Sequence, residues 1–313
     1  MLLNILFIII GVVLVIWGAD RMTEGAVSIA QRLKIPQIVI GLTIVAMGTS
    51  MPEFFVSLMS ALKGTPDLAV GNVVGSNIFN TLLIVGTAAM VTPIVIARST
   101  VKKDMPWSML AAVMLTVMCI DLSISRIDAL ILFAAFVIFI LYTLREARVN
   151  KQSATPAEEE VKSYSPLITV GLVILGLACL IGGSNLFVES ATKVAQELGV
   201  SEAVIGLTIV AGGTSLPELA TSVVAARKGQ SAIAIGNVIG SNVFNVLMII
   251  GITGLVKPMQ ITGITPIDLG VMTAGMVILW LFSFTKFKVE RWEGTVLTVI
   301  FLAYLSWLLY QVV

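Results

Sequence analysis

The sequence contains no histidine and only two cysteines, Cys119 and Cys179, among its 313 residues. The absence of histidine excludes His-based metal sites, histidine proton relays and Ser-His catalytic triads. Both cysteines lie inside apolar runs, where a small buried side chain is expected and no disulfide framework is implied. A metal-ion site would therefore have to rest on oxygen atoms of side chains and backbone.

Charge is also scarce. Charged residues make up 12% of the chain and hydrophobic residues 58%, which excludes an ordinary soluble domain. Runs of about 20 apolar residues recur along the chain, each long enough to cross a bilayer as a helix. The N-terminal MLLNILFIIIGVVLVIW lacks a basic n-region and a convincing cleavage site, so we interpret it as a retained first span. We expect an all-α polytopic membrane protein.

One stretch occurs twice. Residues 40–86 and 205–251 align without a gap, and about 28 of 47 positions are identical. In each copy an apolar segment is interrupted by Gly-Thr-Ser-x-Pro-Glu, and a second segment carries Gly-Asn-Val-x-Gly-Ser-Asn-x-Phe-Asn. The long hydrophilic stretch between the copies predicts a linker over residues 146–165. The chain therefore divides into two halves, 1–145 and 166–313, each built around one repeat core.

Hydropathy predicts ten transmembrane helices, five in each half. They lie near residues 3–20, 36–62, 67–92, 105–121, 126–145, 166–187, 201–226, 231–256, 265–285 and 292–312. An odd number of spans per half places the two copies upside down relative to each other. With the N-terminus outside, the inner loops hold about 15 Lys and Arg residues and the outer loops about four. This bias predicts that both termini lie outside and that the linker is cytoplasmic.

Inverted repeats with interrupted helices are typical of secondary transporters, whose substrate site lies at the repeat interface near the bilayer midplane. Glu53 and Glu218 occupy equivalent places in the middle of apolar spans. A carboxylate at that depth is costly and indicates function. The alternative, a structural Glu that caps a helix broken by proline, is disfavoured because the residue occurs twice and the apolar spans around the two glutamates, 36–62 and 201–226, contain no Lys or Arg.

Pro52 and Pro217 directly precede these glutamates. Proline lacks a backbone donor, so it kinks the helix and frees carbonyl oxygens one turn earlier. Such oxygens are tolerated at membrane depth where they line a cavity or are buried in protein. We therefore expect residues 48–50 and 213–215 to offer free carbonyls and two hydroxyls within a turn of each carboxylate.

The second segment of each copy adds further oxygens. Ser76 and Asn80 lie four residues apart and share a helix face, and Ser241 and Asn245 match them in the second copy. Asn77 is expected to be only partly turned away. The GxxxG spacings of this segment are interpreted as close helix packing. They comprise Gly71, Gly75, Gly236 and Gly240.

Together these groups form an all-oxygen site with two carboxylates. Soft metals prefer Cys or His ligands, which these repeats lack. A flexible, doubly negative oxygen site suits Ca²⁺, which takes six to eight oxygens. Na⁺ has a similar size and a lower charge, so it can use the same ligands. Ca²⁺ and Na⁺ would then compete for one carboxylate pair. This competition gives coupled antiport if the loaded site can switch its opening between the two sides of the membrane and the half-empty, negatively charged site cannot.

GTSMPE with GNVVGSNIFN, repeated as GTSLPE with GNVIGSNVFN, resembles the α-repeats of the cation/Ca²⁺ exchanger superfamily. The strongest likeness is to prokaryotic sodium/calcium exchangers, and it covers essentially the whole chain. The resemblance implies exchange of Na⁺ for Ca²⁺ by alternating access, through movement of the first and sixth spans, in the inner membrane of a prokaryote. It implies no enzyme activity, no cofactor and no nucleic-acid partner. The implied ion ligands are Thr49, Ser50, Glu53, Ser76, Asn80, Thr214, Ser215, Glu218, Ser241 and Asn245, with the backbone carbonyls of Ala46 and Ala211.

Some members of the superfamily carry Asp at one of the positions of Asn80 and Asn245. Asn at both positions weakens the case for potassium dependence or for a titrating group there. The linker of about twenty residues leaves no room for the large regulatory domains of animal relatives. The alternatives are a proton- or potassium-coupled Ca²⁺/cation antiporter of the same superfamily and a cation channel. The sequence sets neither stoichiometry nor oligomeric state, and a monomer is compatible with it.

Overall fold

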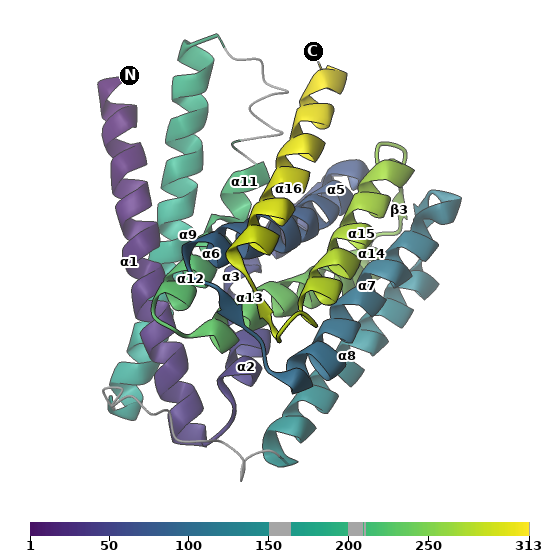
Figure 1. The fold of residues 1–313 in the computed structure, drawn as a ribbon. Helices are drawn as coiled ribbons and strands as arrows, with labels where there is room; N and C mark the ends of the chain where they lie inside the picture. The colour runs from purple at the N-terminus through teal and green to yellow at the C-terminus, as the bar shows by residue number, and fades with distance from the viewer. Residues whose placement is uncertain (150–163, 200–208, 210, 313) are drawn as a thin grey trace.

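The computed structural model describes residues 1–149, 164–199, 209 and 211–312, which are almost wholly helical (Figure 1). The first half contains α1 (Leu2–Leu33), α2 (Gln37–Ile40), α3 (Ala46–Thr49), α4 (Met51–Lys63), α5 (Pro66–Ile78), α6 (Val85–Val91), α7 (Met105–Met118) and α8 (Arg126–Val149). The second contains α9 (Pro166–Glu197), α11 (Ala211–Thr214), α12 (Leu216–Arg227), α13 (Ser231–Val243), α14 (Gly251–Val256), α15 (Pro266–Phe282) and α16 (Arg291–Val312). Equivalent helices recur about 165 residues apart.

Shorter elements connect these helices. Wide π-type turns occupy Gly41–Val45, Thr100–Asp104, Phe79–Ile84 and Phe244–Ile250, and Cys119–Asp121 forms a 3₁₀ turn. Two antiparallel strand pairs tie loops of one half to loops of the other. They join β1 (Ile94–Val95) to β4 (Lys288–Val289) and β2 (Ser123–Ile124) to β3 (Met259–Gln260).

Seven helices in the described part of the chain are long and apolar enough to cross a membrane, and the number rises to eight when one bent pair counts as a span. That pair is Gln37–Thr49 with Met51–Lys63, bent by 47°. The helix α15 is apolar but shorter. The expectation of a helical membrane protein is confirmed, whereas the predicted span 201–226 begins at residues outside the described ones.

The helices α1 and α9 are longer than predicted, at 32 residues each. The predicted ends at residues 20 and 187 are wrong. In α1 the polar residues Asp20, Arg21 and Glu24 lower the hydropathy, yet they pair with one another and with Lys228 at the end of α12, so the helix continues.

The two long helices lie side by side and antiparallel (Figure 1). Gly18 faces Gly176 and Gly11 faces Gly183, so the residue numbers run in opposite directions along the contact. A Cβ at Gly18 would lie 2.8 Å from the carbonyl oxygen of Gly176. Glycine at these positions therefore lets the backbones approach closely, as small residues do in membrane helix pairs.

The helix α13 is the most enclosed element. The apolar window of the span Ser231–Val256 is fully buried. A Cβ at Gly240 would lie 2.7 Å from Cβ of Ala46, and one at Gly236 would lie 3.0 Å from Cα of Gly41. The packing role predicted for the GxxxG glycines is wrong for Gly75, where an added Cβ would meet no described atom within 4 Å, and it is confirmed for these two. It brings α13 directly against the broken helix of the first half, which carries the candidate site.

Candidate ion-binding site

Both halves break their helix at an equivalent serine. Ser50, with φ −84° and ψ 8°, separates α3 from α4, and Ser215, with φ −90° and ψ 6°, separates α11 from α12. A proline follows two residues later in each case and cannot donate to the turn before it. The break therefore follows from the Ser-x-Pro-Glu sequence, and it places a glutamate in the first turn of each new helix.

Glu53 and Glu218 are fully buried and are bound by the opposite half. The Ser50 hydroxyl donates to Glu218 Oε1 at 2.9 Å, and the Ser215 hydroxyl donates to Glu53 Oε1 at 3.2 Å. Because each serine sits at the break of one half, the two breaks face each other across the interface between the halves. The structure thus brings together four residues singled out from the sequence.

Ser76 joins this cluster from α5. Its hydroxyl lies 3.5 Å from Glu53 Oε1 and 3.2 Å from Ser215 Oγ. Its equivalent Ser241 is fully buried on α13. Asn80 and Asn245 are also buried, and each lies in a wide π-type turn, a feature that is frequent at functional sites.

Several buried oxygens of this region receive no hydrogen bond from the residues that the structure describes. They are Glu53 Oε2, Glu218 Oε2, Asn80 Oδ1, Ser241 Oγ and Asn245 Oδ1. A buried carboxylate oxygen without a donor is costly unless a cation approaches it. Within the described ranges no group of three or more His, Cys, Asp and Glu residues gathers, so this site combines two carboxylates with neutral oxygens. That donor set fits Ca²⁺ or Na⁺ as a substrate.

Thr49 and the Ala46 carbonyl are engaged within the first break. The Thr49 hydroxyl lies 3.1 Å from Asn237 Oδ1 and 3.3 Å from the Ala46 oxygen, which also accepts the Ser50 amide at 3.0 Å. In the second half, Ala211 and Thr214 belong to α11, and Thr214 is partly buried. These residues lie beside the glutamate cluster in sequence and add oxygens at both breaks.

The expectation of free carbonyls in both breaks is wrong for Gly213. The Ser184 hydroxyl of α9 donates to its carbonyl oxygen. The equivalent residue of α1 is Ala19, which has no hydroxyl to donate to Gly48. The two halves therefore differ chemically where the long helices touch the breaks, and the difference depends on a residue outside the repeat cores.

Sequence reasoning missed two asparagines that hold the glutamates in place. Asn72 Nδ2 donates to the Glu53 carbonyl at 3.2 Å and to Ser57 Oγ at 3.0 Å. Asn237 Nδ2 does the same in the second half, to the Glu218 carbonyl at 3.3 Å and to Ser222 Oγ at 3.0 Å. The signal was the repeated Gly-Asn that opens the second motif, although the direction of its side chain could not be inferred from spacing.

A second set of asparagines links the halves. Asn77 Nδ2 donates to the Asn242 carbonyl at 3.3 Å, and Asn245 Nδ2 donates to Asn77 Oδ1 at 3.0 Å. Asn242 Nδ2 in turn donates to Thr81 Oγ1 at 2.8 Å. The Asn77 side chain therefore points toward the other half and links the two halves. The expectation that it is partly turned away from the Ser76 and Asn80 face did not include this role.

Comparisons with known proteins agree along the whole chain. The model of the family "sodium/calcium exchanger protein" matches residues 3–145 and 168–310. The putative antiporter CaxA of Alkalimonas amylolytica is 40% identical over 97% of this chain and 98% of its own length. The sodium/calcium exchanger MaX1 of Methanosarcina acetivorans is 32% identical over 98% and 99%. The structure of the sodium-calcium exchanger NCX_Mj soaked with Na⁺ and Ca²⁺ superposes with a TM-score of 0.85 at 29% identity, covering 98% of both chains.

Proposed function

Because the chain belongs to the sodium/calcium exchanger protein family, we propose that it exchanges Na⁺ for Ca²⁺ across the membrane by alternating access. The observation that carries the proposal is the buried carboxylate pair. Each carboxylate is bound by the broken helix of the opposite half and keeps one oxygen without a donor in the described chain. A site shared in this way can form and open as the halves move relative to each other.

In the proposed site the two glutamates supply the negative charge and the other groups supply neutral oxygens. Ser50, Ser215 and Ser76 lie at hydrogen-bonding distance from the carboxylates and would turn their lone pairs toward a bound cation. The remaining proposed ligands are Thr49, Thr214, Asn80, Ser241, Asn245 and the carbonyls of Ala46 and Ala211. The set needs no resident cofactor, because the cations are the substrates.

The charge of the carboxylate pair accounts for coupling. When Ca²⁺ leaves, two negative charges stay in a buried site, and moving them through a low-dielectric interior is costly. Na⁺ ions restore the balance, so a sodium-loaded site can change its access and an empty one cannot. This requirement distinguishes an exchanger from a channel, in which ion flow needs no return of a second ion.

For alternating access we propose that the halves are two inverted five-helix units and that α1 moves together with α9. Support comes from the antiparallel α1–α9 pair and from helices that recur about 165 residues apart. In the proposed orientation both termini lie outside and residues 146–165 are cytoplasmic. In that orientation the ion pairs between α1 and Lys228 would lie on the cytoplasmic side and hold α1 against the end of α12 there. A single chain carries the whole proposed ligand set, so a monomer suffices.

The proposal is tested by ion binding to the purified protein. Ca²⁺ at about 100 times its dissociation constant should stabilise the wild type by about 2.7 kcal/mol. Glu53→Gln and Glu218→Gln each remove one charge from the site, so both should lose most of this stabilisation. Thermal unfolding with and without Ca²⁺ measures it. The control is Glu189→Gln, on the exposed face of α9. Full Ca²⁺ stabilisation of either buried variant would contradict the proposed site.

A further inference from the structure

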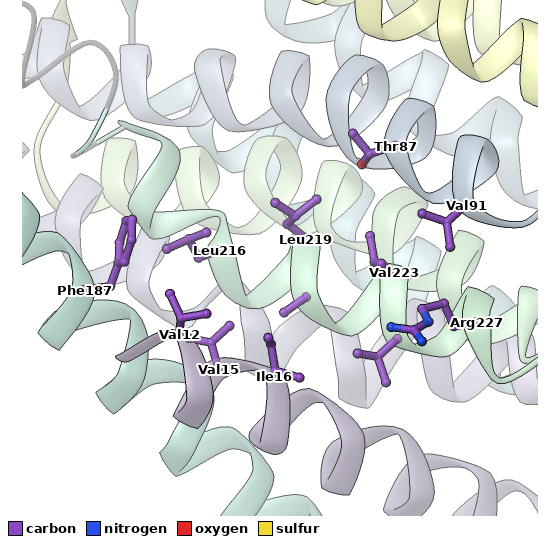
Figure 2. A pocket seen from close by; sticks show the side chains of 12 residues that line it. Val12, Val15, Ile16, Thr87, Val91, Phe187, Leu216, Leu219, Val223 and Arg227 are labelled. Carbon is purple, nitrogen blue, oxygen red and sulfur yellow. The ribbon is translucent and has the colours of Figure 1, made fainter. Parts of the chain in front are cut away.

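An apolar groove of about 420 Å³ lies between α1 and α12, with the end of α6 along one side (Figure 2). Val12, Val15 and Ile16 of α1 line it opposite α12. In Figure 2, Leu216 and Phe187 stand at one end of the groove, and Arg227 stands at the other. Its walls are mostly aliphatic, with Phe187 and Thr87 among them, and Arg227 is the one charged side chain that lines it.

The dimensions of the groove match one leaflet of a bilayer. Along α12 it extends from Leu216 to Arg227, which is about 16 Å at the rise of an α-helix. The hydrocarbon core of a bilayer is about 30 Å thick, so the groove covers about half of it. Leu216 directly follows Ser215 of the candidate site, which is expected near the midplane. The groove therefore extends from the middle of the membrane to one surface, which is the same depth that the acyl chain of a lipid spans.

Arg227 is a cation without a protein partner among the described residues. Its side chain is exposed and makes no hydrogen bond or ion pair there. Asp20 lines a neighbouring pocket together with Arg227, but its carboxylate binds Lys228 and Arg21, and Glu24 binds the same two cations. An arginine at the end of an apolar groove is thus left to bind an anion from outside the chain, and its planar fork matches a phosphate group.

The other half does not reproduce this arrangement. The residue equivalent to Arg227 is Leu62, near the end of α4, and the equivalent of Lys228 is Lys63. An apolar side chain therefore stands where the second half has its cation. The guanidinium at this position is therefore a feature of the second half alone.

We propose that this groove binds one acyl chain of an anionic glycerophospholipid, whose phosphate group is held by Arg227. The bound lipid lies against the contact between α1 and α12, so it stabilises the conformation in which these helices touch. In the orientation given under the proposed function, on which this one point rests, the groove lies in the cytoplasmic leaflet. The lipid site itself does not depend on which ions the protein carries.

The test is lipid retention by the full-length protein in detergent, measured by native mass spectrometry without Ca²⁺. The probes are phosphatidylglycerol and phosphatidylcholine with identical acyl chains. The wild type should retain one phosphatidylglycerol about fivefold more tightly than phosphatidylcholine. Arg227→Gln should lose this preference, and Lys63→Gln, an exposed cation at the end of α4, should keep it. Ala220→Phe, which fills the groove, should weaken both lipids.

Equal retention of the two lipids by the wild type would overturn the proposal, and so would an undiminished preference in Arg227→Gln. If Ala220→Phe does not fold, the Arg227→Gln and Lys63→Gln variants still test the proposal, because both replace exposed side chains and should fold. Lipid retention is read without ion transport. A negative lipid result would therefore not contradict the exchange function, and a negative exchange result would not contradict lipid binding.

Discussion

At the scale of single residues, the candidate site depends on its two carboxylates and equally on the side chains that fix the backbone beside them. Asn72 and Asn237 each bind the carbonyl of the glutamate on the neighbouring broken helix, with the same partners in both halves. Neither contacts a carboxylate oxygen. Their role is to hold the first turn of α4 and α12, and hence the direction in which each carboxylate points.

Replacement of these asparagines should therefore weaken ion binding without removing any ligand. Asn72→Ala loses two hydrogen bonds, and Asn237→Ala loses three, because Asn237 also accepts from the Thr49 hydroxyl. We expect the apparent affinity for Ca²⁺ to fall about tenfold, or about 1.4 kcal/mol. Calorimetric titration of the purified variants measures this change. Asn4→Ala, which alters an exposed contact with Glu197, is the control. Unchanged Ca²⁺ affinity in both Asn72→Ala and Asn237→Ala would refute the positioning role.

At the scale of elements, the conformation is held by ion pairs at the end of α12. Lys228 Nζ lies 2.5 Å from Asp20 Oδ1 and 3.4 Å from Glu24 Oε1, so α12 is tied to α1. In the other half, Asn185 stands in the position of Asp20, and Glu189 pairs within its own helix with Lys193. Only one side of the molecule therefore has these pairs, and they favour the state in which α1 touches α12.

Lys228→Gln should loosen this contact. The pairs are about one-third exposed, and such pairs contribute about 0.2–1 kcal/mol each, so we expect the α1–α12 equilibrium to shift about threefold toward the separated state. Spin labels at Leu33 and Gln230 report the separation through their distance distribution. Lys193→Gln should leave that distribution unchanged. A distribution in Lys228→Gln identical to the wild type would show that the ion pairs do not hold the helices together.

At the scale of the whole molecule, the internal repeat made most of the fold predictable. The broken helices, the positions of Glu53 and Glu218 and the meeting of the two breaks follow from two copies of one sequence. The end of α1 was missed because hydropathy cannot show that Asp20 and Arg21 find partners, and the end of α9 was missed because it cannot show that Glu189 pairs with Lys193. Asn72, Asn237 and Ser184 were missed because their contacts depend on how helices from different parts of the chain bend and pack.

The proposed orientation in the membrane can be checked by labelling. In a background with Cys119→Ser and Cys179→Ser, a Ser153→Cys variant should react with an impermeant maleimide only after the cells are permeabilised, because the linker is expected in the cytoplasm. Lys257→Cys, in a loop predicted to lie outside, should react in intact cells. Labelling of Ser153→Cys in intact cells would reverse the orientation.

The most direct test of the whole account is coupled ion flux. Proteoliposomes loaded with Na⁺ and diluted into Na⁺-free buffer should take up ⁴⁵Ca²⁺, whereas vesicles loaded with K⁺ should not. Glu53→Gln vesicles should behave like the K⁺-loaded ones. Equal ⁴⁵Ca²⁺ uptake with and without the Na⁺ gradient would contradict Na⁺/Ca²⁺ exchange. Uptake driven by a pH gradient would then indicate proton coupling, and uptake down the Ca²⁺ gradient alone, without a Na⁺ or pH gradient, would indicate a channel.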